Sequence, residues 1–207
     1  MSVWTSCSRL DKQLDNTTLY HIIKASEPEA VRYSKYLTEQ GLSPTLLSCW
    51  FVVDLEKGLD RIVDEMDRTR RRGVRKGREN GVEVEAEPLE EAELEEFYEA
   101  YRRNMEHIDG SVFPRSFFTA LAEQLPDRAM VFTATHEGDV IGRYLHVLDE
   151  EQSKLRYFFS AIGDDSHYEH NVSGMPHIHA MEWSIERGYT TYDFGATDAD
   201  FSDGLFK

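Results

Sequence analysis

The sequence contains only two cysteines, Cys7 and Cys49, and no Cys-x-x-Cys pair. Isolated cysteines of this kind indicate reduced, structural thiols and a reducing compartment. No apolar run approaches the 18 residues of a membrane-spanning helix, and the opening MSVWTSCSRL lacks the apolar stretch of a signal peptide. These absences favour a cytoplasmic protein.

Basic residues are also scarce. The 207 residues include 23 Lys and Arg against 39 Asp and Glu, so the net charge is -16. This balance argues against a general nucleic-acid binder, because phosphate binding needs a basic surface. The acids are spread along the chain, which is typical of a solvating surface suited to high salt. The hydrophobic content of 40% is sufficient for a core, and the length allows one domain and a piece of another.

The first half of the chain mixes helical and strand patterns. We expect residues 1–48 to be irregular apart from a helix over 28–40, closed by Gly41. A short apolar strand follows at 50–54. Apolar residues at helical spacing then predict a helix over 59–66 that continues into a basic run at 68–78.

In the second half of the chain the spacing of apolar residues changes from helical to alternating and then back to helical. Helical patterns cover 94–105 and 117–125, and alternation then predicts three strands at 129–135, 140–148 and 155–161. A helix over 175–187 and a strand over 189–194, ending at Gly195, complete the order. The remaining residues are expected to form a polar loop. This order indicates an α+β fold with an antiparallel meander and a helical crossover.

Five strings in this order resemble the FemAB-related branch of the GNAT superfamily, also called the BioF2-like acetyltransferase domain. The resemblance covers roughly residues 49–207. It implies a GNAT-like fold with a central, mostly antiparallel sheet flanked by helices. The strings are Val52–Leu55, Arg71–Lys76 with Gly81–Val84, Val112–Phe118, Tyr192–Gly195 and Phe206–Lys207.

The family commonly holds two such domains in tandem. On this basis residues 1–48 are interpreted as the tail of a preceding GNAT-like domain, and 49–207 as an acyltransferase domain that is incomplete at its C-terminus. A sheet without its last strands would expose Tyr192 and Phe194 at an open edge. We therefore expect low stability and self-association through that edge.

The resemblance implies an acyl- or aminoacyl-transferase that acts on an amine of a sugar or cell-envelope precursor. The implied donor is acyl-CoA or aminoacyl-tRNA, with no metal and no covalent enzyme intermediate. Two alternatives stay open: an acetyl-CoA-dependent N-acetyltransferase, and an inactive GNAT fragment that serves as a binding module. The usual pyrophosphate-binding loop of GNAT enzymes is absent around 163–174, which counts against ordinary acetyl-CoA binding.

The basic run holds seven of the 23 basic residues between Arg68 and Arg78. Arg71, Arg75 and Lys76 match the family's basic positions and are expected to line the cleft and bind a phosphate. Because the run is placed at a helix end, a helix N-terminus is not expected to contribute. The alternative is a cationic last turn that pairs with the helix dipole and with the ten acids of residues 79–99.

Two further positions are candidates for catalysis. Asp193 follows an apolar strand and could act as a base or orient the amine, or it could simply bind nearby backbone N–H groups. Lys207 matches a family lysine that is implied to stabilise charge. His167, His170, His177 and His179 are not expected to bind metal, since His177 and His179 are two residues apart and point to different faces of a helix.

Overall fold

The computed structural model describes residues 38, 39, 41, 43, 48–162 and 174–198. The chain separates into two compact units, Met1–Leu46 and Leu47–Lys207. In the first unit, Thr38 and Glu39 are helical, and Gly41, at a φ of +84°, donates its N–H to the Thr38 carbonyl. The rest of the predicted helix over 28–40 lies outside the described residues, and the origin of residues 1–48 stays a prediction.

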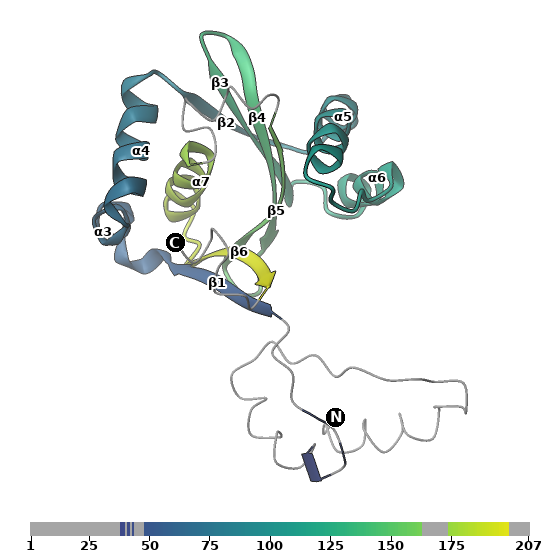
Figure 1. Ribbon diagram of the computed structural model, residues 1–207, viewed down its shortest axis with the longest axis horizontal. Coiled ribbons are helices and arrows are strands. Elements are labelled where there is room, and N and C mark those ends of the chain that lie inside the picture. The colour runs from purple at the N-terminus through teal and green to yellow at the C-terminus, as the bar shows by residue number, and fades with distance from the viewer. Residues whose placement is uncertain (1–37, 40, 42, 44–47, 163–173, 199–207) are drawn as a thin grey trace. The chain divides into compact units, whose positions relative to one another are not determined.

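The described part of the second unit contains six strands, five α-helices and one short 3-10 helix (Figure 1). The described elements are β1 (Ser48–Asp54), η2 (Leu55–Lys57), α3 (Leu59–Glu65), α4 (Arg68–Glu79), β2 (Glu83–Pro88), α5 (Glu91–His107), α6 (Arg115–Gln124), β3 (Ala129–His136), β4 (Asp139–Asp149), β5 (Lys154–Ile162), α7 (Met175–Glu186) and β6 (Thr191–Asp198).

The six strands form one sheet in the order β1-β6-β5-β4-β3-β2. Every neighbouring pair is antiparallel except β5 and β6, which are parallel. Helices α4 and α7 cover one face of the sheet, and α5 and α6 cover the other (Figure 1). The predicted α+β class with a mostly antiparallel, helix-flanked sheet is confirmed.

Strand β3 shows why alternation predicted the meander correctly. Met130 and Phe132 pack into a core cluster with Ala180 of α7, whereas Ala129 and Val131 pack with the α5 and α6 side chains. Successive side chains of a strand point to opposite faces, so a strand covered on both faces buries all of them. Each face therefore has its own apolar core.

The predicted open edge at Tyr192 and Phe194 is wrong. Strand β6 lies inside the sheet, between β1 and β5, and Tyr192 is fully buried. The strand also does not end at Gly195 but continues to Asp198, which pairs with Ser48 of β1. The edge is covered because β1 joins β6 from the distant N-terminal side of the unit, a pairing that local patterns do not report.

The single helix predicted to continue from 59–66 into the basic run is also wrong. Met66 is extended, with a ψ of 153°, and Asp67 caps a new helix by accepting a hydrogen bond from the Thr69 N–H at 2.7 Å. Asp is a favoured N-cap because its side chain satisfies a backbone N–H that has no helical partner. The basic run is therefore the whole of α4 rather than the last turn of a longer helix.

Candidate active site

The parallel strands β5 and β6 separate after a short paired segment, and this point of separation is called the fork. Only three residue pairs join β5 to β6: Lys154 with Thr191, Leu155 with Tyr192 and Arg156 with Asp193. Beyond them β6 runs with β1 to Asp198, while β5 stays paired with β4 as far as Ile162 (Figure 1). Within the described part of the chain, Phe159–Ile162 pair with β4 and not with β6. A strand that separates from its neighbour in this way can present backbone groups to a ligand.

Asp193 lies in the last residue pair before β5 and β6 separate. Its Oδ2 lies 3.1 Å from Arg156 Nε on β5, and its Oδ1 accepts a hydrogen bond from the Gly195 N–H at 2.8 Å. Gly195 adopts a φ of +85°, which favours glycine, and this conformation turns its N–H toward the carboxylate. The Arg156 guanidinium also lies 5.3 Å from the centre of the Trp50 ring of β1. One carboxylate thus joins β5 and β6, and Arg156 extends the contact to β1.

The sequence left two roles open for Asp193: a catalytic base, or an acceptor of hydrogen bonds from nearby backbone N–H groups. The structure shows a contact of the second kind, with the Gly195 N–H. It adds an ion pair with Arg156 that the sequence did not indicate. The residue is only 1% exposed, and both side-chain oxygens have partners. A role for Asp193 as proton acceptor stays a prediction.

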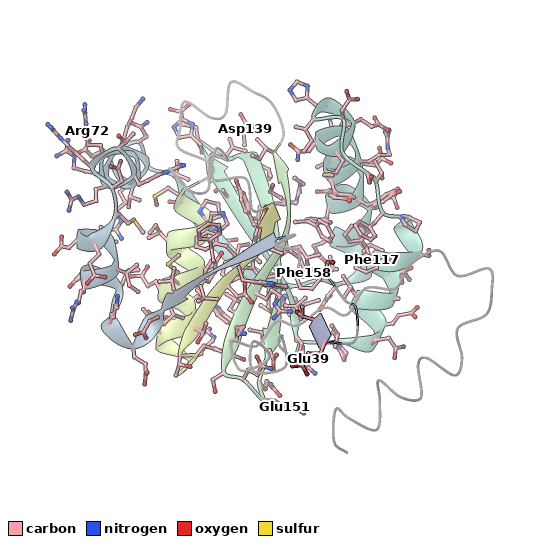
Figure 2. The ribbon with its side chains drawn as sticks, turned by 60° about the horizontal axis from the view of Figure 1, so that its bottom comes forward. Glu39, Arg72, Phe117, Asp139, Glu151 and Phe158 are labelled. Atoms are coloured by element: carbon pink, nitrogen blue, oxygen red, sulfur yellow. The ribbon has the colours of Figure 1, made fainter. Side chains whose placement is uncertain are left out.

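We expect Asp193→Ala to lower the free energy of unfolding by about 3 kcal/mol, because it leaves the Gly195 N–H and the Arg156 guanidinium without their partner. Urea unfolding of both proteins at pH 7 measures this. Asp139→Ala is the matched control: Asp139 is exposed at the start of β4 (Figure 2) and its loss should change stability by no more than about 0.5 kcal/mol. Equal effects of the two substitutions would contradict an anchoring role.

Above the fork lies a cluster of histidine and tyrosine side chains. The His177 ring of α7 is centred 5.0 Å from Tyr157 and 4.9 Å from Phe194, the first residues of β5 and β6 beyond their last pair. His177 Nδ1 lies 2.6 Å from the Tyr192 hydroxyl, and that hydroxyl lies 2.8 Å from His146 Nε2. A half-buried histidine at the mouth of the fork is thus linked to a fully buried one on β4.

Burial keeps this cluster uncharged at neutral pH. Desolvation, with a smaller contribution from nearby His177, lowers the pKa of His146 to about 3. Desolvation, and then the positive charge of Arg70, lowers the pKa of His177 to about 4. Burial raises the pKa of Tyr192 well above its ordinary value. The hydrogen bonds therefore join three neutral groups.

Most cations of α4 lack an acidic partner. Arg75 pairs with Glu79 at 3.5 Å, an exposed contact worth about 0.3–0.5 kcal/mol. The Arg71 guanidinium donates to the Asp64 carbonyl and so ties α4 to α3. Within the described residues no ion pair neutralises the other five: Arg68, Arg70, Arg72, Lys76 and Arg78.

The acidic segment 79–99 does not neutralise α4, contrary to one of the two expectations. Apart from Glu79, its ion-paired acids contact other cations: Glu95 pairs with Arg115, Glu96 with Arg143 and Glu99 with Arg102. The prediction that the run could not offer a helix N-terminus fails as well, since the run begins at one. Figure 2 shows Arg72 pointing outward from α4.

The three predicted phosphate ligands do not share one face of α4. At 100° per residue, Arg71 and Arg75 lie one turn apart, whereas Lys76 is rotated by about 100° from Arg75. Arg70, whose charge acts on His177, is not among the predicted ligands. Its signal was present: Arg70 lies one turn before Val74, which is buried against Met175 and Ile178 of α7. The α4 cation that acts electrostatically on His177 is therefore one that the family strings did not mark.

The remaining candidates contribute less. Lys207, His167 and His170 lie outside the described residues. His179 is in ring contact with Phe132, 6.2 Å away, while His177 faces the fork. No group of three or more potential metal ligands occurs in the described part of the chain, and no helix described there is long and apolar enough to cross a membrane.

Residues 65–203 match the family model described as an acetyltransferase (GNAT) domain. The fold is similar to the crystal structure of FemX, with a TM-score of 0.70 and 16% identity over 96% of this chain and 68% of FemX. It is similar to the C-terminal domain of a putative lysylphosphatidylglycerol synthetase from Agrobacterium fabrum, with a TM-score of 0.52 and 13% identity over 80% of this chain and 52% of that one.

A tandem GNAT protein from the clavulanic acid biosynthesis pathway matches with a TM-score of 0.50 and 10% identity, over 95% of this chain and 60% of that one. The chain thus spans about two thirds of FemX and little more than half of the other two proteins. At these identities the likeness concerns the fold. No curated protein matches the chain.

Proposed function

The chain belongs to the acetyltransferase (GNAT) domain family, and on that premise we propose that it transfers an acyl or aminoacyl group to an amine of a sugar or cell-envelope precursor. The amine nitrogen forms a bond with the donor carbonyl carbon, and the bond from that carbon to the donor's sulfur or oxygen breaks. The amine loses a proton, and the leaving thiolate or alkoxide gains one. The donor is acyl-CoA or aminoacyl-tRNA.

The observation that carries this proposal is the fork between β5 and β6. Direct acyl transfer needs a donor held in an extended conformation and N–H groups directed at the carbonyl oxygen, where negative charge develops. From Phe159 to Ile162, β5 pairs with β4 and not with β6 among the described residues, so alternate residues there can direct backbone N–H groups into the fork. Such groups are positioned by the sheet itself, so they need no rearrangement during the reaction.

The charge of α4 supports a donor that carries phosphate. Both CoA and tRNA are polyanions, and α4 offers five cations without an acidic partner in the described chain. Val74 packs α4 against the first turns of α7. The positive charge of Arg70, near the start of α4, acts electrostatically on His177 beside the fork. We propose that Arg70 binds the donor nearest to its acyl end and that Arg75 and Lys76 bind phosphates farther out.

The names of the similar proteins support the aminoacyl version. A lysylphosphatidylglycerol synthetase is named for a product in which an amino acid is joined to a lipid. An aminoacyl donor would also fit the absence of the usual pyrophosphate loop from the sequence around 163–174. The acceptor amine and the choice of donor are decided by experiment.

We expect the purified chain to transfer label from one of two donors, radiolabelled acetyl-CoA or aminoacyl-tRNA, to an amino sugar or an envelope precursor with a free amine. Arg70→Gln should weaken donor binding at least about tenfold, since a hydrogen bond to a charged group contributes about 1.5–3 kcal/mol. A triple variant that also carries Arg75→Gln and Lys76→Gln should bind more weakly still, with a shallower salt dependence. Isothermal titration at two salt concentrations measures both.

The matched control is Arg103→Gln, which removes one exposed positive charge from α5 on the other face of the sheet. Its donor affinity should equal that of the unmodified chain. Unfolding midpoints of all variants should agree within about 2 °C, because exposed substitutions change stability little. Equal losses of affinity in Arg70→Gln and Arg103→Gln would reject α4 as the donor site, and binding without any transfer would reject the transferase proposal.

A further inference from the structure

The hydrogen bonds of the histidine cluster have a defined direction. His146 Nδ1 lies 3.2 Å from the Tyr144 carbonyl oxygen, which can only accept, so Nδ1 carries the proton. In neutral imidazole the other nitrogen is then bare, and His146 Nε2 accepts the Tyr192 O–H. The Tyr192 oxygen in turn accepts from His177 Nδ1–H. By the same rule His177 Nε2 is bare.

The unprotonated nitrogen is Nε2 of His177, the residue that lies beside Tyr157 and Phe194 where β5 and β6 separate. Among the described residues nothing bonds His177 Nε2, and the ring is half-buried between Tyr157 and Phe194. The titratable and charged groups around this ring are Tyr144 and His146 on β4, Tyr157 on β5, Tyr192 on β6 and Arg70 on α4. Among the described residues, no carboxylate is one of these neighbours. A neutral, oriented lone pair in such surroundings is suited to accept a proton.

We propose that His177 Nε2 is the general base of the transfer and that Tyr192 and His146 are positioning residues that hold it in the required tautomer. This inference rests on the proposed function. As the amine nitrogen bonds to the donor carbonyl carbon, its proton passes to His177 Nε2. The resulting imidazolium donates through Nδ1–H to Tyr192, whose O–H donates to His146. When the bond to the donor's sulfur or oxygen breaks, the leaving group takes the proton, and His177 is neutral again.

The positive charge of Arg70 contributes to the same step. It disfavours a second cation in the fork, so the acceptor amine is held there in its neutral, nucleophilic form. The pKa of about 4 keeps His177 unprotonated at neutral pH, and it makes the imidazolium a strong acid that passes its proton to the leaving group. Arg70 thus has two effects, one on the donor phosphate and one on the protonation of the groups in the fork.

The test compares His177→Gln with His179→Gln, a histidine two residues farther along the same helix that faces Phe132. His177→Gln should lower kcat by about 10²–10⁴-fold, the usual contribution of a general base. Donor affinity measured by titration calorimetry should stay within about threefold, and His179→Gln should retain full activity. Transfer by His177→Gln within threefold of the unmodified chain would overturn the proposal.

A second measurement does not depend on turnover. In ¹⁵N-labelled protein at pH 7, His177 should show a bare Nε2 and a protonated Nδ1, and Tyr192→Phe should convert it to a mixture of tautomers. His177 Nε2 carrying a proton in the unmodified chain would overturn the proposal. If the unmodified chain transfers nothing from either donor, the proposed function fails, and the tautomer alone decides whether the fork holds a base.

Discussion

Lowering the pH from 7 to 5 should reduce the free energy of unfolding by about 4 kcal/mol, about 2 kcal/mol for each of His146 and His177. The pKa of both is depressed by folding, from an ordinary value of 6.5 to about 3 and about 4. Between pH 6.5 and 4 the unfolded chain therefore binds protons that the folded chain does not. Stability is complete above pH 6.5 and is lost as the pH falls toward the folded values.

Urea unfolding at pH 7, 6 and 5 in 0.15 M salt measures this slope. Folding also lowers the pKa of three carboxylates, Glu65, Asp67 and Glu99. These groups lose their contribution to stability mainly below pH 5, so the loss between pH 7 and pH 5 comes from histidine. The double variant His146→Gln/His177→Gln should have a much shallower profile over this range, with His179, whose pKa burial also lowers, as the remaining contribution. An unmodified chain that is equally stable at pH 7 and pH 5 would show that the two rings are not held neutral by burial.

Phe118→Ala should lower the free energy of unfolding by about 3–5 kcal/mol, the usual range for removing a buried phenylalanine. Phe118 is fully buried, and its ring contacts those of Phe97, Tyr101 and Phe159 at centroid distances of 4.9–5.6 Å. These rings come from α5, α6 and β5. The substitution leaves a cavity at the place where both helices pack on the sheet, so the loss includes contacts of all three elements.

The matched control is Phe113→Ala. Phe113 belongs to the same aromatic cluster and contacts Phe117 and Phe159, but it is 44% exposed. Its removal should cost about 1 kcal/mol, because water already reaches one side of the ring and little cavity forms. Chemical unfolding of the two variants separates burial from aromatic content. Equal losses would mean that α6 packs less tightly on α5 and β5 than the structure shows.

Elements that depend on neighbouring residues were predictable. The meander over 129–161 was predicted because β3 and β4 alternate between two cores, and α5 because Leu94, Phe97 and Tyr101 share one helical face. The family was also indicated from short strings in a fixed order. The break at Asp67 was missed, although Asp is a favoured N-cap residue whose side chain accepts a bond from the backbone N–H two residues later. There the apolar spacing of 59–66 was given more weight than the cap.

The sequence by itself determined the concentration of positive charge in α4, the inner faces of the helices and the GNAT relationship, since each depends on residues close together in the chain. Only the tertiary structure decided that β6 lies between β1 and β5, that β5 and β6 part after Arg156 and Asp193, and that His177 meets His146 through Tyr192. Periodicity reports which side of an element faces the core but not which element lies beside it. The candidate base was therefore visible in the sequence only as one histidine among several, because its partners are 15 and 31 residues away and lie on different strands.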